Sequence, residues 1–304
     1  MNITHVLRGH EWQTSTSKHL LLYKAFQWKP PIFGHLPLLE RERGRKLSKR
    51  DPENVKNPIE IEYYRQKGYY ADGILNFITL CGGGGFSDLE QVIGKTLTEM
   101  ISLFDIKLFS RHAAIVDFKK LELCQRAHLR RAYYDQSKES RNQIFDEIRR
   151  RILVHYPEKK TNASFQLQDE YLEKIFNMID FRISLLDELF SNDLYEYLWK
   201  EPQLKLDHID CPQQFRYVIE ATLNNLNEIQ FNYNDVKTLV SNSRELKLDN
   251  KKVFRIWRLV LCGCVQGPPV HEIASFFGSE IVRKRLKNAL VVLDRQNENV
   301  QKKM

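Results

Sequence analysis

Apolar residues recur at helical spacing through the second half of the chain. A stripe at i, i+3, i+4 and i+7 places its members on one face of a helix. Three sets follow this spacing: Leu172, Ile175, Phe176 and Ile179; Phe215, Val218, Ile219, Thr222, Leu223 and Leu226; and Val253, Ile256, Trp257, Val260 and Leu261. We predict amphipathic helices there that face a shared core, with a polar linker at 157–164 and a loop at 198–212.

The start of the chain has a different pattern. Ile3 to Leu7 is short and apolar, Thr16 can cap a following helix, and Ile32 to Leu39 is a second apolar run containing Pro37. A helix between two strands implies a parallel pair. Parallel sheets have both faces covered. Two strands at the start of a chain cannot make such a sheet, so we expect this α/β segment to be the tail end of a larger one.

The middle of the chain is predicted to be helical. Residues 40–58 are polar and basic and are expected to form a long loop. Helices are predicted at 59–66, 72–79, 89–103, 121–134 and 140–155, with the glycine run at 82–85 ending the second of them.

Charge and cysteine content narrow the class of protein. The net charge is +8 and the pI about 9.1, which favours a polyanionic partner such as a nucleic acid, although a merely basic soluble protein fits the charge equally well. Five cysteines without regular spacing argue against a disulfide framework, and without a C-x-x-C pair we expect no zinc. No apolar run reaches about 18 residues, so no membrane span is expected. Residues 1–12 resemble neither a signal peptide nor a transit peptide.

A cationic loop is the sharpest local signal. Lys46-Leu47-Ser48-Lys49-Arg50 follows the second predicted strand. Ligands of parallel sheets bind beyond the carboxyl ends of the strands, and a cationic loop there can neutralise the charge of a departing pyrophosphate. Taken alone, the five residues fit a solvated basic loop better.

Arg8, Glu11 and Trp12 follow the first strand at the same edge. Arg8 could bind a carboxylate through a bidentate pair, and Trp12 could form the wall of a pocket. Taken alone, this segment fits a surface turn with a packed Trp.

Together these segments carry a family resemblance. The chain resembles the catalytic C-terminal half of class I glutamyl-tRNA synthetases in the following runs: Thr4-His5-Val6-Leu7-Arg8-Gly9, Glu11-Trp12, Lys18 to Ala25, Trp28-Lys29-Pro30-Pro31, His35-Leu36-Pro37-Leu38-Leu39 and Lys46 to Arg50, which is similar to the loop named KMSKS. The resemblance continues through Tyr69 to Phe77 and the glycine turn from Cys81 to Phe86, and more weakly through Gly267-Pro268-Pro269 and Val282 to Leu290.

The resemblance implies a substrate site. Arg8 and Trp12 would line the glutamate pocket, Glu11 would contact ATP, and Leu39 would contact adenine through its backbone. Lys46, Leu47, Ser48, Lys49 and Arg50 would bind ATP, with Lys46 and Lys49 stabilising the leaving pyrophosphate and Mg²⁺ accompanying the ATP. His10 stands where the family commonly has an acidic residue, so it is given no role.

The resemblance also implies that the chain has three regions with different functions. Residues 1–58 would form the C-terminal part of a Rossmann-type catalytic domain, 59–158 a helical stem-contact region, and 159–304 a helical anticodon-binding domain. The partners would be tRNA(Glu), glutamate and ATP, bound by a monomer without a membrane. Four arginines could contact tRNA phosphates or simply face solvent: Arg149, Arg150, Arg283 and Arg285. The glycine turn and Tyr197-Leu198-Trp199 resemble mitochondrial enzymes of animals, so the mitochondrial matrix is expected.

One departure from the family is large. The HIGH motif, which binds ATP phosphates, has no counterpart in this sequence, and a gene model started at an internal Met is the simplest explanation. A truncated, catalytically inactive isoform that binds tRNA is the first alternative. A general helical RNA-binding protein is weaker, because it leaves Arg8, Trp12 and the Lys46 loop without a shared purpose.

Overall fold

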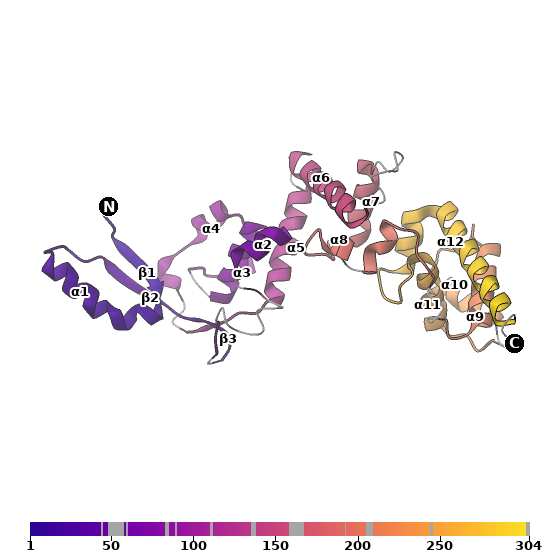
Figure 1. Ribbon diagram of the computed structural model, residues 1–304, viewed down its shortest axis with the longest axis horizontal. Helices are drawn as coiled ribbons and strands as arrows, with labels where there is room; N and C mark the ends of the chain where they lie inside the picture. Colours follow the sequence, from indigo (N-terminus) through magenta and orange to yellow (C-terminus); the bar gives the residue numbers. More distant parts are fainter. Residues whose placement is uncertain are drawn as a thin grey trace. The chain divides into compact units, whose positions relative to one another are not determined.

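The computed structural model divides into two compact units, Met1–Asn142 and Gln143–Met304 (Figure 1). It describes residues 1–43, 45–47, 58, 60–82, 85–88, 90–109, 112–134, 138–157, 167–191, 193–204, 209–243 and 246–301. Among the described residues, no helix is both long and apolar enough to cross a membrane. The division of the chain into three regions stays a prediction.

The chain begins with the predicted strand–helix–strand unit. Strand β1 (His5–Gly9) leads through a 3₁₀ turn, η1 (His10–Ser15), into helix α1 (Thr16–Ala25), and strand β2 (Ile32–Leu36) returns parallel to β1. The register pairs His5 with Ile32 and Gly9 with Leu36, which confirms the parallel pair.

Thr16 does not cap α1, so that prediction is wrong. Because the 3₁₀ turn runs directly into the helix, the N-cap position falls on Ser15, whose side chain makes no capping bond. Thr16 is the first helical residue, and its hydroxyl lies 3.2 Å from the Trp12 carbonyl, to which it donates. The hydroxyl is thereby placed against the end of β1.

The two-stranded unit exposes several of its apolar side chains. No residue of β1 or α1 is buried, and Leu21, Trp28 and Ile32 are each about two-thirds exposed. Parallel strands are normally covered on both faces. The described residues do not supply that cover, which agrees with the expectation that these strands belong to a larger sheet.

Residues 39–42 and 45–46 belong to a second small sheet, so the predicted loop at 40–58 is wrong in its first part. Strand β3 (Leu39–Glu42) pairs antiparallel with β4 (Arg45–Lys46) and parallel with β5 (Ala114–Ile115). Pro37 separates β2 from β3, because proline cannot donate to a sheet. Leu39 and Leu47 pack on a core built from helices α3 and α5 and the residue after β5.

Helices make up the rest of the first unit. They are α2 (Ile61–Lys67), α3 (Ala71–Gly82), η3 (Glu90–Val92), α4 (Leu97–Leu103), η4 (Ile106–Leu108) and α5 (Lys119–Tyr134); α6 (Lys138–His155) crosses into the second unit. Asn76 on α3 is fully buried: its Nδ2 donates to the Lys95 carbonyl (2.9 Å), and its Oδ1 accepts from the Gly94 amide (2.7 Å) and lies 2.9 Å from His128 Nε2. These bonds tie α3, α5 and the turn before α4 together.

The second unit is helical, as its apolar stripes predict. Its elements are α7 (Asp169–Ile179), α8 (Glu188–Ser191), η6 (Asp193–Leu198), α9 (Pro212–Asn224), α10 (Tyr233–Asn242), α11 (Asn250–Cys262) and α12 (Val270–Gln301), which breaks at Gly278. Trp257 on α11 is fully buried, and its Nε1 donates to Thr222 Oγ1 on α9 at 2.9 Å. Residues of all three predicted stripes are buried, and this bond joins the stripes of α9 and α11.

Candidate functional site

Arg8 is the centre of the first site. It lies near the carboxyl end of β1, half-buried, and its guanidinium donates to His35 Nε2 (3.2 Å), His19 Nδ1 (2.9 Å) and Thr16 Oγ1 (2.8 Å). It also lies over the ring of Phe33, 4.7 Å from the centroid. Because arginine only donates, both imidazole nitrogens must accept and carry no proton. All these partners are neutral, so the guanidinium is held in place without being neutralised.

Trp12 lies beside this guanidinium, and Glu11 lies over the neighbouring Gly9. The Trp12 ring is half exposed, with its centroid 5.9 Å from the Arg8 guanidinium carbon. The Glu11 side chain folds back over Gly9 so closely that a β-carbon at Gly9 would overlap the carboxylate. The structure therefore brings together Arg8, Glu11 and Trp12, which were predicted to share a site, and Gly9 leaves space for the acidic member.

The cationic loop is described only at its start. Lys46 ends β4, and Ser48, Lys49 and Arg50 lie outside the described residues. The Leu47 amide donates to the Leu39 carbonyl at 3.0 Å, so one backbone group of Leu39 is occupied by the sheet. Phosphate binding by the loop and adenine binding by Leu39 stay predictions.

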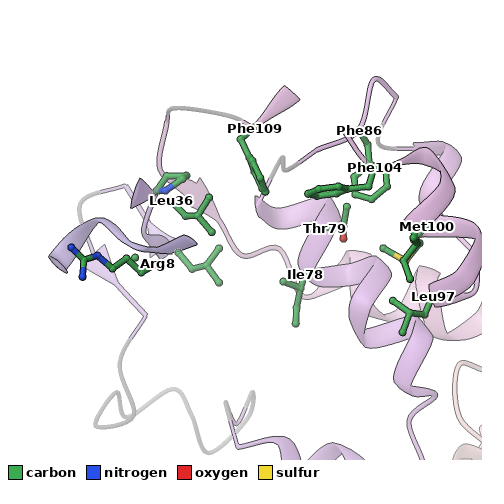
Figure 2. A pocket seen from close by; sticks show the side chains of 13 residues that line it. Arg8, Leu36, Ile78, Thr79, Phe86, Leu97, Met100, Phe104 and Phe109 are labelled. Atoms are coloured by element: carbon green, nitrogen blue, oxygen red, sulfur yellow. The ribbon is translucent and has the colours of Figure 1, made fainter. Parts of the chain in front are cut away.

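An apolar cavity of about 550 Å³ opens where β1 and β2 end (Figure 2). Its wall consists of Arg8, Gly9, Leu36, Pro37, Leu39, Ile78, Thr79, Phe86, Leu97, Met100, Ile101, Phe104 and Phe109. Figure 2 shows the Arg8 guanidinium pointing away from the aromatic side chains. Arg8 therefore contributes the aliphatic part of its side chain to the cavity wall, and its charged group lies outside the cavity. The cavity lies beyond the carboxyl ends of a parallel pair, where α/β folds bind ligands.

A second candidate site is a basic cavity of about 600 Å³ in the Gln143–Met304 unit, and sequence reasoning missed it. Its wall consists of Lys251, Phe254, Arg255, Arg258, Val265, Gly267, Pro269, Val270 and His271, with no acidic side chain among these described residues. Arg258 donates to the carbonyls of Val265 (3.3 Å) and Pro268 (3.4 Å), and its Nε is buried without a partner. The sequence does contain a pattern that predicts a basic helix face here, because Lys251, Arg255 and Arg258 are spaced i, i+4, i+7 on α11.

The four predicted RNA-contacting arginines lie in different surroundings. Arg149 pairs with Asp146 (2.9 Å) and with Asp169, and Arg150 pairs with Glu147 (2.6 Å). Arg283 is exposed on α12. The prediction that these side chains contact tRNA stays untested.

Arg285 does not face solvent, so that alternative is wrong for this residue. It is 8% exposed, donates to the carbonyls of Leu261 and Tyr197 (3.2 Å to the latter), and lies 3.8 Å from the centroid of Phe277. Burial lowers the pKa of this arginine. Its hydrogen bonds join α12 to α11 and η6, because a buried guanidinium must find partners inside the fold. Of the two predicted arginines on α12, we retain Arg283 as the candidate for RNA contact.

Comparisons with known families agree with these two units. Residues 1–123 match the catalytic domain of class I tRNA synthetases for glutamate and glutamine, and residues 143–290 match an anticodon-binding domain. The chain is therefore similar, in this order, to a catalytic and an anticodon-binding domain of tRNA synthetases. This confirms the fold class expected from the resemblance, an α/β catalytic segment followed by helical domains.

Its relatives are named glutamate–tRNA ligases. The mitochondrial glutamate–tRNA ligase of Schizosaccharomyces pombe is 30% identical over 297 residues, covering 96% of this chain and 54% of the relative. The enzymes of Chloroherpeton thalassium and Chlamydia trachomatis are 30% and 32% identical, with 57% and 56% of their lengths covered. The chain thus spans little more than half the length of these relatives.

A solved structure shares the fold. The glutamate–tRNA ligase of Elizabethkingia meningosepticum, crystallised with its amino acid, matches with a TM-score of 0.68 and 24% identity. The match covers 96% of this chain and 58% of that one.

Proposed function

We propose that the protein acts as a glutamate–tRNA ligase, to which this chain contributes Arg8, Trp12 and the Lys46–Arg50 loop. The Arg8 site carries the proposal: a half-buried guanidinium, fixed by three neutral acceptors, lies beside an exposed Trp at the end of a parallel strand. A carboxylate is the ligand that such a guanidinium binds best, since bidentate pairing matches its geometry. The catalytic-domain match at residues 1–123 supports glutamate as the carrier of that carboxylate.

The reaction would proceed in two steps. A carboxylate oxygen of glutamate attacks the α-phosphorus of ATP, and the bond to pyrophosphate breaks. A ribose hydroxyl of the terminal tRNA nucleotide then attacks the acyl carbon, and AMP leaves. Arg8 and Trp12 would orient glutamate, while Lys46 and Lys49 would neutralise the departing pyrophosphate. Mg²⁺, bound with ATP, would share the phosphate charge. Catalysis would thus rest on positioning and electrostatics.

Glu11 and Leu39 would also contact the ATP. The Glu11 carboxylate is exposed and lies over Gly9, and Leu39 begins the strand that follows β2. A carboxylate accepts hydrogen bonds from ribose hydroxyls, and a backbone group of a strand end suits a purine edge. We therefore keep both residues as ATP contacts.

The basic cavity on α11 would receive an unpaired nucleotide of the tRNA anticodon. Single-stranded RNA is recognised by stacking of bases on aromatic and Arg side chains, with phosphate contacts around them. Phe254 and Arg258 provide the ring and the guanidinium plane, and Lys251 and His271 line the same cavity. The anticodon-domain match at residues 143–290 includes all of them. Arg149, Arg150 and Arg283 remain candidate phosphate contacts around it.

A binding test separates the two candidate functions. This chain, titrated with tRNA(Glu) and with an unrelated tRNA, should prefer tRNA(Glu) and lose affinity in Arg258→Ala by about tenfold, as for one charge-assisted contact. Lys237→Ala, which removes an exposed cation on α10, serves as the control. Equal binding of both tRNAs would leave a general RNA-binding protein and refute the ligase assignment.

An activity test follows. Glutamate-dependent exchange of pyrophosphate into ATP, measured on the full gene product and on this chain, reports the first step. We expect exchange from the full product. Binding of tRNA(Glu) without exchange in every form would instead support a tRNA-binding isoform, for which the basic cavity on α11 is the favouring observation.

The proposed compartment is the mitochondrial matrix. The mitochondrial relative from S. pombe supports it, while bacterial relatives of similar identity do not distinguish compartments. Fractionation of source cells with an antibody to residues 143–304 tests it, and a signal confined to the cytosol would contradict it.

A further inference from the structure

Two cysteines meet at the end of α11. Cys262 is the last residue of the helix and is buried, whereas Cys264 is partly exposed. Gly263 between them caps the helix in the left-handed conformation (φ 73°), which turns both side chains to the same side. Both cysteines line the same cavity, one residue apart on either side of this glycine.

This pair lies on the wall of an open cavity of about 550 Å³. The cavity is also lined by Asp193, Glu196, Tyr197 and Gln266, so small solutes can reach the Cys264 sulfur. The hydrogen bond from Cys262 lowers the pKa of Cys264, and the nearby Arg258 guanidinium acts in the same direction. Burial raises the pKa of Cys262. Cys264 is thus suited to react first with an oxidant, and Cys262 is the nearby thiol that can react with it afterwards.

We propose that Cys262 and Cys264 form an oxidisable dithiol that hydroperoxides convert to a disulfide, and that this loosens the basic cavity on α11. The Cys264 thiolate attacks one hydroperoxide oxygen: the S–O bond forms, the O–O bond breaks, and the leaving oxygen takes a proton to give water or an alcohol. The Cys262 thiolate then attacks the Cys264 sulfur, an S–S bond forms, and hydroxide leaves to take the proton that Cys262 released. Two thiols are oxidised and one hydroperoxide is reduced.

Arg258 links this chemistry to the basic cavity. In the reduced protein the Cys264 thiol donates to the Gln266 carbonyl (2.8 Å), and the Val265 carbonyl between them accepts from Arg258 (3.3 Å). A disulfide removes the thiol proton and draws Cys264 toward the helix end. The turn from Cys264 to Pro268 then loses one of its hydrogen bonds, and the Arg258 guanidinium loses its fixed position. The effect on RNA rests on the proposed function, but the oxidation itself does not.

Mass spectrometry of the reduced full chain tests the oxidation. Trypsin releases Leu259 to Arg283 as one peptide, because no Lys or Arg lies inside it. After limited hydrogen peroxide and alkylation, this peptide should carry no alkyl group and should have lost two hydrogen atoms, while Cys211 is still alkylated. Cys264→Ser should abolish the change. Cys262→Ser should leave a sulfenic acid on Cys264 that dimedone captures, and Cys262→Ala serves if the serine variant does not fold.

The opposite results would overturn the inference. The inference is wrong if Cys211 is oxidised before Cys264, or if the disulfide forms only when the protein is unfolded in urea. In the RNA arm, the oxidised chain should bind tRNA(Glu) about five- to tenfold more weakly than the reduced chain, and peroxide should not affect Cys264→Ser. An unchanged affinity would refute the link through Arg258. A disulfide in a chain that binds no RNA in either state would count against the proposed function alone, whereas RNA binding without a disulfide would count against this inference alone.

Discussion

Replacement of Arg8 by lysine tests the central assignment most directly. The guanidinium makes three hydrogen bonds that point in different directions, to His35, His19 and Thr16. A lysine ammonium keeps the charge but cannot hold these three acceptors and a carboxylate in one plane. Arg8→Lys should therefore lose orientation rather than charge, which separates a specific carboxylate contact from a general electrostatic effect.

The size of the effect follows from the hydrogen bonds that a lysine cannot make. A hydrogen bond to a charged group is worth about 1.5–3 kcal/mol, and a bidentate pair becomes at best a single bond in the lysine variant. The kcat/KM for glutamate should fall by roughly 10- to 150-fold, while the KM for ATP changes little. The assay is glutamate-dependent pyrophosphate exchange on the full gene product. Lys18→Ala, which removes an exposed cation from α1, is the matched control.

Two outcomes would refute this reasoning. If Arg8→Lys leaves the glutamate dependence unchanged, Arg8 does not contact the substrate carboxylate. If the KM values for glutamate and ATP rise together, Arg8 maintains the fold of the strand end and does not select a ligand. Circular dichroism of both variants would show whether β1 and α1 are intact.

The other predictions concern stability. Asn76→Ala should lower the free energy of unfolding of the first unit by about 2–4 kcal/mol in urea titrations, since it leaves buried groups without partners; no loss would contradict the network. Thr222→Val should cost about 1–2 kcal/mol by removing the acceptor of Trp257, and Thr222→Ser should restore most of it. The Thr96 amide, Arg131 and the Thr96 hydroxyl hold the pKa of Glu99 at about 2, below its usual 4.5. The stability from Glu99 should be present above its unfolded pKa and be lost as the pH falls from 4.5 toward 2; melting curves of Glu99→Gln should lack that part of the acid dependence.

The helices could be predicted from the sequence because their signal is local. Leu172, Ile175 and Ile179 on α7 are all fully buried, as their spacing requires. The sheet of β3, β4 and β5 could not be predicted, because its segments are short and polar and β3 is completed by pairing with Ala114 and Ile115, far away in sequence. Such pairing leaves no periodic mark in a short segment.

The candidate site could be predicted only in part, because some of its contacts are local in sequence and others depend on how the strands pair. Arg8 and Trp12 are close in sequence and follow a strand, so their association could be expected. The role of His35 depends on strand register, which places it directly opposite Arg8. A shift by one residue would turn His35 to the other face of the sheet. No feature of residues 32–36 alone fixes that register, so the neutral partners of Arg8 emerged only from the structure.

The partners of each arginine decide whether it can bind a ligand. Arg149 and Arg150 pair with carboxylates of their own fold, so a phosphate must compete with those carboxylates. Arg285 is buried, and its guanidinium is held by the carbonyls of Leu261 and Tyr197. Arg8 and Arg258 differ from Arg149 and Arg150 because neutral acceptors fix the direction of their guanidinium groups, and Arg258 also lines a basic cavity. A guanidinium in that state has already lost the side-chain entropy that binding would cost. Clusters of basic residues in this sequence are therefore weaker evidence for a nucleic-acid contact than an arginine such as Arg258, whose partners are carbonyls and which lines a basic cavity.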